Sequence, residues 1–183
     1  LYIGVLWMVF SLSILQAKEI KMSSPDEKYQ FTLSDEGGNL HYSLNWNAKE
    51  TIKPSLLGIK ANTIWRDHLS LGDMTTAEQD TVWHPVYGER STIKDQYKAW
   101  SVVINRQNSR DKLVLDIRAY NEGIAFRYRF PGGQYLKITD EFTEYTLPEG
   151  TKAYFTSRAQ TPYEFLPLEG CCLLYTSDAA DEL

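Results

Sequence analysis

An alternation of apolar and polar side chains with a period of two constrains this chain more than any other feature of its sequence. Between residues 124 and 130 the apolar positions are Ile124, Phe126, Tyr128 and Phe130, and the positions between them are Ala125, Arg127 and Arg129. Successive side chains of a β-strand point to opposite faces, so this segment predicts a strand with an inner aromatic face and an outer face that carries arginines. The Asn-Glu-Gly sequence before it predicts a turn that lets the preceding strand pair with this one, since Gly123 tolerates a positive φ angle.

The same alternation recurs along the chain and predicts further strands at residues 29–33, 40–46, 56–60, 96–107 and 112–120. Gly37-Gly38 marks a hairpin turn between the first two. Residues 135–165 are expected to hold the last strands, whereas residues 62–97 are polar, contain several loop signals and are expected to be less regular. No segment shows a sustained helical period with capping residues. We therefore predict an all-β fold, an antiparallel β-sandwich.

Composition is that of one folded domain and excludes one class of function. The chain has 183 residues, of which 43% are hydrophobic, and this is enough for a buried core. The formal net charge of -5 leaves no basic footprint for a nucleic acid, so no such partner is expected. The aromatic share of 13% suits either β-structure or a surface that contacts sugars.

The N-terminal residues 1–17 differ in composition from the rest of the chain. They are apolar, carry no charge and end in small or polar residues, which is the pattern of the hydrophobic part of a secretory signal peptide. We therefore expect export, most simply to a bacterial periplasm. A membrane anchor or a buried first strand is the alternative interpretation, although the run is short for a stable membrane span.

The C-terminal residues 171–183 also stand apart in composition. They resemble the translated read-through of a sequencing adapter, and a genuine flexible tail is the alternative. The domain is therefore placed at residues 18–170, and the gene is expected to be cut near Gly170. Cys171 and Cys172 are adjacent, and neighbouring cysteines lie too close to bridge each other, so no disulfide framework is expected.

Few sequence motifs carry chemistry. The chain has no phosphate-binding loop, no serine nucleophile elbow and no H-E-x-x-H motif. His41, His68 and His84 lie at no metal-ligand spacing from one another, and the acidic segment 140–145 is interpreted as a solvated strand face. A glycosidase carboxylate pair is defined by its separation in space, which spacing along the sequence does not give.

Five short motifs carry a resemblance to a known family. In chain order they are SPD from Ser24, KPSLLGI from Lys53, WHPVYGER from Trp83, RAYNEGIAFRYRFP from Arg118 and DEFTEYTLPEG from Asp140. Together they resemble the N-terminal β-sandwich domain of glycoside hydrolase family 97, the bacterial α-glucosidases and α-galactosidases, over residues 23–168. Tyr87 departs from the family pattern, which has tryptophan at this position.

The resemblance implies a supersandwich of the galactose-mutarotase type, incomplete in this chain because the family's N-terminal domain continues beyond it. In the family a (β/α)8 barrel follows and carries the catalytic acid and the nucleophile or base. The parent protein would then hydrolyse O-glycosyl bonds of an oligosaccharide, whereas this chain would contribute no catalytic residue. The alternative is a free-standing periplasmic β-sandwich that binds carbohydrate or is structural.

The resemblance also implies one metal ligand. Family members hold calcium at the active site with carboxylates, and one comes from the N-terminal domain, where the matching segment TPYEF here points to Glu164. Calcium takes several oxygen ligands at once, so the alternative, an exposed loop glutamate, stays open. Trp83, Tyr87 and Glu89 also have two interpretations, a surface that faces the barrel or a sugar, or, as favoured here, core packing around a turn.

Overall fold

The computed structural model describes residues 17–132, 135–156 and 162–168. Its strands are β1 (Glu19–Ser23), β2 (Tyr29–Ser34), β3 (Leu40–Trp46), β4 (Lys49–Leu57), β5 (Ile59–Lys60), β6 (Ile64–Trp65), β7 (Leu69–Trp83), β8 (Ile93–Arg106), β9 (Lys112–Tyr120), β10 (Gly123–Arg129), β11 (Asp140–Glu141), β12 (Lys152–Phe155) and β13 (Glu164–Pro167). The predicted signal segment, apart from Ala17, and the predicted adapter-like tail lie outside the described residues. Within them, no helix is long and apolar enough to cross a membrane.

The first sheet is an antiparallel meander in the order β1-β2-β3-β4. A single turn of 3-10 helix, Glu36–Gly38, joins β2 to β3, with φ angles of 62° at Gly37 and 79° at Gly38. Residues with a side chain rarely adopt these angles, and glycine adopts them freely. The predicted glycine hairpin is therefore confirmed.

The second sheet is also antiparallel, in the order β10-β9-β8-β7. Strands β7 and β8 have 15 and 14 residues and pair from Leu69 opposite Arg106 to Trp83 opposite Ile93. The expectation of a less regular segment at 62–97 was wrong for most of this stretch. In the outer half of the β7–β8 hairpin both faces are exposed or half-buried. This part of the segment therefore lacks the apolar alternation by which a half-buried strand is found in a sequence.

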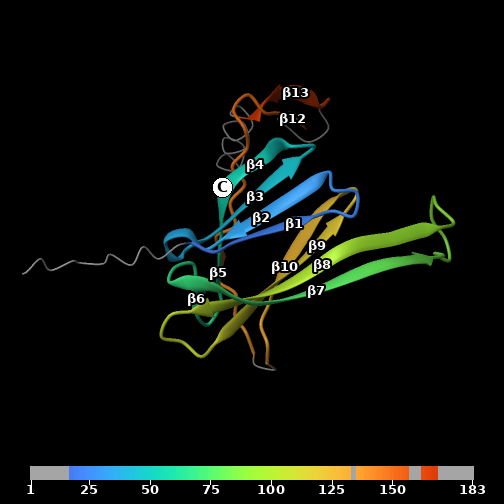
Figure 1. Cartoon of the computed structure of the whole chain (residues 1–183). Helices are drawn as coiled ribbons and strands as arrows, with labels where there is room; N and C mark the ends of the chain where they lie inside the picture. The colour runs from blue at the N-terminus through green and yellow to red at the C-terminus, as the bar shows by residue number, and fades with distance from the viewer. Residues whose placement is uncertain (1–16, 133–134, 157–161, 169–183) are drawn as a thin grey trace, which may run out of the picture.

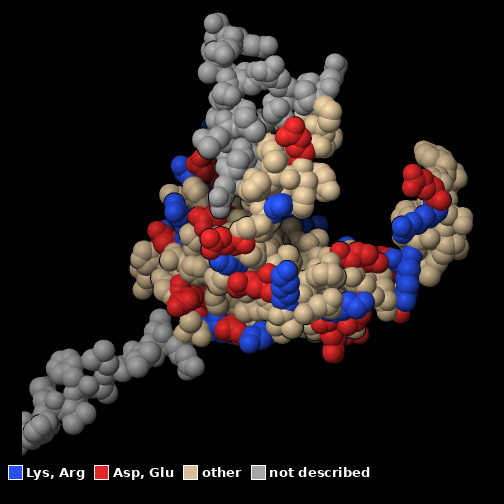
Figure 2. Space-filling model, turned by 90° about the horizontal axis from the view of Figure 1, so that it is seen from above, with Lys and Arg blue, Asp and Glu red and all other residues tan. Residues whose placement is uncertain are grey.

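The outer half of this hairpin, residues 80–96, projects beyond the other strands and is called here the arm. The pairing of β8 with β9 begins only at Tyr97. In the arm, β7 and β8 therefore pair only with each other. Figure 1 shows its two green strands extending away from the sheets, and Figure 2 shows it standing apart from the body. An isolated two-stranded ribbon is marginally stable in water.

The two four-stranded sheets pack face to face and enclose one core, as the sandwich prediction requires (Figure 1). The first sheet contributes Met22, Phe31, Leu33, Leu40, Tyr42 and Leu57, and the second contributes Leu71, Val102, Ile104, Leu113, Leu115 and Ile117. Rings interlock across the interface, with the Phe126 centroid 5.7 Å from that of Tyr42 and 6.3 Å from that of Phe31. The aromatic face of β10 therefore points inward, with Ile124, Phe126, Tyr128 and Phe130 partly buried against the core.

Two sequence-based details of the fold are corrected. Gly123 does not have a positive φ angle, because the turn is completed by Asn121 and Glu122, and Gly123 already belongs to β10 opposite Tyr120. In the first half of the segment 135–165, where the last strands were expected, the only strand among the described residues is β11, which pairs with β5. The rest of that segment follows β4 and β5 through single hydrogen bonds, such as Phe142 N–H to Gly58 O at 2.8 Å and Lys53 N–H to Thr146 O at 2.8 Å.

Candidate functional site

The outer face of the second sheet carries three rows of side chains that cross β7, β8, β9 and β10. Directly paired residues of antiparallel strands lie on the same face, so the register gives each row. The rows are Gln79, Tyr97, Tyr120 and Gly123; Ala77, Ala99, Arg118 and Ala125; and Thr75, Ser101, Asp116 and Arg127. The three alanines of the middle row leave a groove of about 620 Å³, which Arg118 of the same row also lines.

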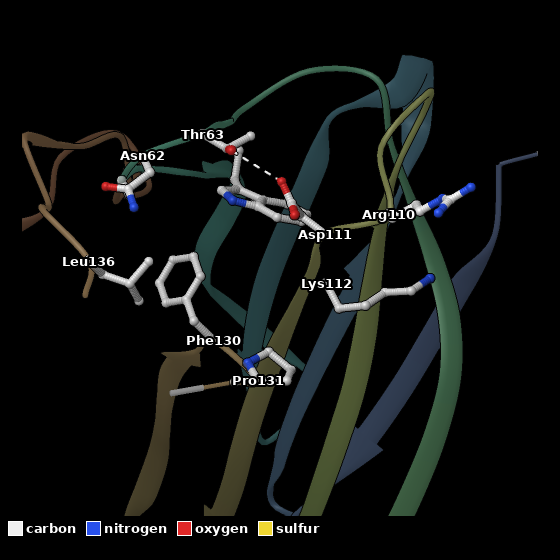
Figure 3. A pocket seen from close by; sticks show the side chains of 11 residues that line it. Asn62, Thr63, Arg110, Asp111, Lys112, Phe130, Pro131 and Leu136 are labelled. Atoms are coloured by element: carbon white, nitrogen blue, oxygen red, sulfur yellow. Dashed lines mark hydrogen bonds between the residues drawn. The ribbon is translucent and has the colours of Figure 1, made fainter. Parts of the chain in front are cut away.

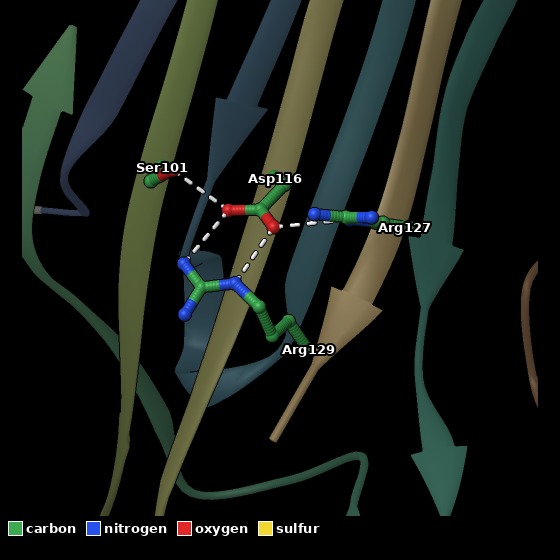
Figure 4. Close-up of polar contacts among 4 residues, drawn as sticks. All are labelled: Ser101, Asp116, Arg127 and Arg129. Atoms are coloured by element: carbon green, nitrogen blue, oxygen red, sulfur yellow. Dashed lines mark hydrogen bonds and ion pairs between the residues drawn. The ribbon is translucent and has the colours of Figure 1, made fainter. Parts of the chain in front are cut away.

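Asp116 is the centre of a polar network at one end of this groove (Figure 4). Arg129 from β10 donates from Nε at 2.8 Å and from Nη2 at 3.0 Å, and Arg127 donates from Nε at 3.1 Å. Ser101 Oγ donates at 2.7 Å from β8. These contacts outweigh the cost of burial and hold the pKa of the Asp116 carboxyl well below its usual range, with the Arg129 hydrogen bond as the largest cause.

Two tyrosines and an arginine form the other end of the groove. The rings of Tyr97 and Tyr120 are tilted with their centroids 5.0 Å apart. The Arg118 guanidinium lies 4.5 Å from the Tyr97 ring centroid and donates to Tyr120 Oη at 3.4 Å. The hydrogen bond to Tyr120 is the main reason that the pKa of Arg118 is raised. Both ends of the groove are therefore held in place by contacts between side chains.

A second hollow, of about 290 Å³, lies between β6 and the ends of β9 and β10 (Figure 3). Its lining includes Phe130, Leu136 and the buried indole of Trp65. The Asn62 amide is used within the chain, since Nδ2 donates to Tyr135 O at 3.1 Å and Oδ1 accepts from Lys137 N at 3.2 Å. Figure 3 shows the side chains of Arg110 and Lys112 extending away from this hollow, so we interpret it as structural.

Glu164, the predicted calcium ligand, is exposed at the start of β13 and pairs with Phe155 across the β12–β13 hairpin. Among the described residues, no group of three or more histidine, cysteine, aspartate or glutamate side chains could hold a metal ion. Calcium requires six to eight oxygen ligands, and one carboxylate supplies at most two. The described residues therefore do not form a calcium site by themselves, and Glu164 could serve only as one ligand among others.

The arm corrects the favoured interpretation of Trp83, Tyr87 and Glu89. Core packing was expected, but Trp83 is 51% exposed and Tyr87 is 89% exposed, and Glu89 is exposed in the same loop. The loop is held locally, for example by the contact of His84 Nδ1 with Ser91 O at 2.9 Å. The aromatic residues of this motif therefore face solvent, away from the sandwich core.

The sequence indicated the outer position of Arg127 and Arg129 but missed the residues around them. Tyr97 and Ser101 lie on one predicted strand and Asp116 and Tyr120 on the next, and the parity of each strand places them outward. The missing information was the register between strands, which brings residues 101, 116 and 127 into one row. A search for polar residues of outward parity on neighbouring predicted strands would have found them.

The fold and the groove together place the chain among antiparallel β-sandwich domains. The family described as Glycosyl-hydrolase 97 N-terminal matches residues 22–169, and the chain belongs to this family.

The relatives that the chain matches are much longer than the chain itself. The chain is 22% identical over 151 residues to a retaining alpha-galactosidase of Bacteroides thetaiotaomicron. This match covers 81% of the chain and 22% of the relative. A glycoside hydrolase family 97 enzyme from Pseudoalteromonas sp. strain K8, solved with acarbose, has a similar fold with a TM-score of 0.73 and 23% identity over 82% of this chain and 25% of that one. A beta-arabinopyranosidase structure has a TM-score of 0.68 and 21% identity over 80% of this chain and 26% of that one. The chain thus spans about a quarter of the length of these relatives.

Proposed function

We propose that this chain is the non-catalytic N-terminal β-sandwich domain of an exported α-glycosidase of the α-glucosidase or α-galactosidase class. In the complete protein it packs on a (β/α)8 barrel that carries the catalytic residues and binds the oligosaccharide substrate. The observation that carries the proposal is the family match over residues 22–169. The named activity of the Bacteroides relative and the panose and acarbose complexes of the Pseudoalteromonas enzyme support the class of substrate.

The sandwich contributes support rather than chemistry in this proposal. Its titratable groups on the outer face are engaged with one another, as Asp116 is with Arg127 and Arg129. General acid or base catalysis needs a side chain whose proton is available near the operating pH, and a carboxylate held by two guanidinium groups with a lowered pKa does not meet this need. The barrel therefore supplies the acid and the nucleophile or base.

Glu164 is proposed as one calcium ligand that the sandwich lends to the complete protein. Its exposure at the start of β13 leaves the carboxylate accessible to a second domain. The remaining oxygen ligands would come from the barrel, so calcium binding would couple the docking of the two domains. Bound calcium would supply positive charge close to the substrate.

The native gene downstream of residue 169 tests the domain proposal, and calcium binding by its full-length product tests the role of Glu164. We expect the reading frame to continue into a (β/α)8 domain. In that protein, Glu164→Gln should lower calcium affinity at least about tenfold, as the loss of one charged ligand of several, whereas Glu149→Gln should leave it unchanged. A native stop codon with no barrel would support the free-standing sandwich instead. Equal calcium affinity of the two variants would remove Glu164 from the site.

A further inference from the structure

The groove on the outer face of β7–β10 is a built polar site rather than a bare sheet face. Its middle row presents the small side chains of Ala77, Ala99 and Ala125, together with Arg118, between two bulkier rows. Its volume, about 620 Å³, lies in the range typical of small-molecule sites. The groove therefore has a floor and two walls.

The guanidinium groups at one wall of the groove are fixed in direction, and some of their N–H groups make no hydrogen bond to the described residues. Asp116 holds Arg127 by Nε and Arg129 by Nε and Nη2. Within the described part of the chain, the two terminal nitrogens of Arg127 and Nη1 of Arg129 make no hydrogen bond. A guanidinium presents its N–H groups as a planar fork, so these nitrogens can donate to two neighbouring hydroxyl oxygens without first paying the entropy of ordering the side chain.

The opposite wall is aromatic. Tyr97 and Tyr120 are half-buried, and their contact holds the two rings at one end of the groove. Tyrosine offers a large apolar face with a polar tip. A pyranose ring has the matching chemistry, with C–H groups on its faces and hydroxyl groups around its edge.

The charges around the groove identify the class of ligand. Arg118, Arg127 and Arg129 are matched by three carboxylates, namely Asp116 in the network, Glu78 on the lining and Asp95 near Arg118. A site without net charge favours a neutral ligand over an acidic or a basic one.

We propose that the groove formed by Tyr97, Tyr120, Arg118, Arg127, Arg129 and Asp116 binds a neutral oligosaccharide, with Tyr97 and Tyr120 packing against a sugar ring and the free N–H groups of Arg127 and Arg129 donating to hydroxyl oxygens. This site belongs to the sandwich itself and goes beyond the support of a barrel. It gives the chain a means of holding a glycan without any catalytic residue.

Isothermal titration of the full 183-residue chain with maltoheptaose and with panose tests the proposal. We expect saturable binding of at least one of these neutral sugars. Tyr120→Ala should weaken it at least about tenfold, as the removal of a central aromatic contact does. Arg127→Lys, which keeps the charge but loses the fork, should weaken it several-fold. The matched control is Tyr87→Ala in the arm, which removes an equally large but distant exposed ring and should leave binding unchanged.

Near-ultraviolet circular dichroism of each variant establishes that the sandwich is folded. A folded wild-type chain that binds neither neutral sugar would overturn the proposal. Equal binding by wild type, Tyr120→Ala and Arg127→Lys would show that sugars bind elsewhere, which also overturns it. Tighter binding of oligogalacturonate than of maltoheptaose would contradict the neutral class of ligand, and capture of a protein at the groove that blocks sugar binding would contradict the sugar as its occupant.

Discussion

Asp116 organises the outer face of the second sheet, since four hydrogen bonds from Ser101, Arg127 and Arg129 end on its carboxylate. The side chain of Asp116 is only 15% exposed, whereas Arg127 is 69% exposed and Arg129 45%. Water therefore screens part of the attraction, although the paired contacts of Arg129 remain stronger than those of an ordinary surface ion pair.

Replacing this carboxylate should destabilise the fold modestly. Asp116→Asn should lower the free energy of unfolding by about 1–2 kcal/mol, measured by urea denaturation at neutral pH. Asp140→Asn is the control, because Asp140 forms a single exposed pair with Lys60 at 3.2 Å and should cost less than about 0.5 kcal/mol. Equal denaturation midpoints for wild type and Asp116→Asn would show that the network does not stabilise the sandwich.

The Asp116 carboxylate also makes the stability of the fold depend on pH in acid. Its pKa is lower in the folded chain than the value of about 3.9 expected in the unfolded chain. Its contribution is therefore present above the unfolded pKa and lost as the pH falls through the folded pKa. Wild-type stability should decline below about pH 4 more steeply than that of Asp116→Asn.

The buried Tyr42 and the partly buried Tyr128 give a prediction at alkaline pH. Burial raises the pKa of Tyr42 and of Tyr128 to about 12, and the hydrogen bond between Tyr128 Oη and Thr143 Oγ1 opposes the effect at Tyr128. Because both values exceed the unfolded value of about 10, their contribution to stability is complete below that pH and is lost as the pH rises toward 12. Ultraviolet titration of phenolate should show these two groups ionising last, and Tyr42→Phe should remove one of them.

Among the elements, the arm differs from every strand of the core. Residues 80–96 form a ribbon of two strands, while the inner halves of β7 and β8 continue into a four-stranded sheet. Few buried side chains support the ribbon, and hydrogen bonds in such regions open locally without global unfolding. The sandwich should therefore hold its core while the arm opens.

Hydrogen exchange measures this difference in local opening between the arm and the core. Amides of residues 80–83 and 93–96 should exchange at least about 100-fold faster than those of residues 101–105 in the same strand β8. The comparison within one strand is an internal control, because solvent and pH are identical for both halves. Equal protection along β8 would mean that the arm is held by contacts beyond its own ladder.

The sequence allowed the elements with a one-sided apolar pattern to be predicted, and little else. Phe126 and Tyr128 were placed inward correctly because the core accepts only one face of β10. Residues 69–83 could not be recognised as one long strand, since the outer half of β7 has no buried face to impose a pattern. The Asp116 network also escaped, because its members meet through strand register and not through spacing along the chain.

At the scale of the whole molecule, two sheets share one core while one broad outer face is shaped by charged and aromatic side chains. Strands β1 and β10 lie at sheet edges in the described part of the chain. Exposed edges invite pairing with further strands, and we expect the complete protein to cover them. In our proposal the catalytic chemistry belongs to a domain that adjoins the sandwich, and the sandwich provides support and a binding site for the glycan.

The most direct test of this account is the release of p-nitrophenol from p-nitrophenyl α-galactoside and α-glucoside by the purified 183-residue chain, with a complete family 97 enzyme as the positive control. We predict no release above the buffer rate, because the groups in the groove are committed to binding and to one another. Release that exceeds the buffer rate and disappears in Asp116→Asn would contradict the account, since it would place the catalytic machinery inside the sandwich.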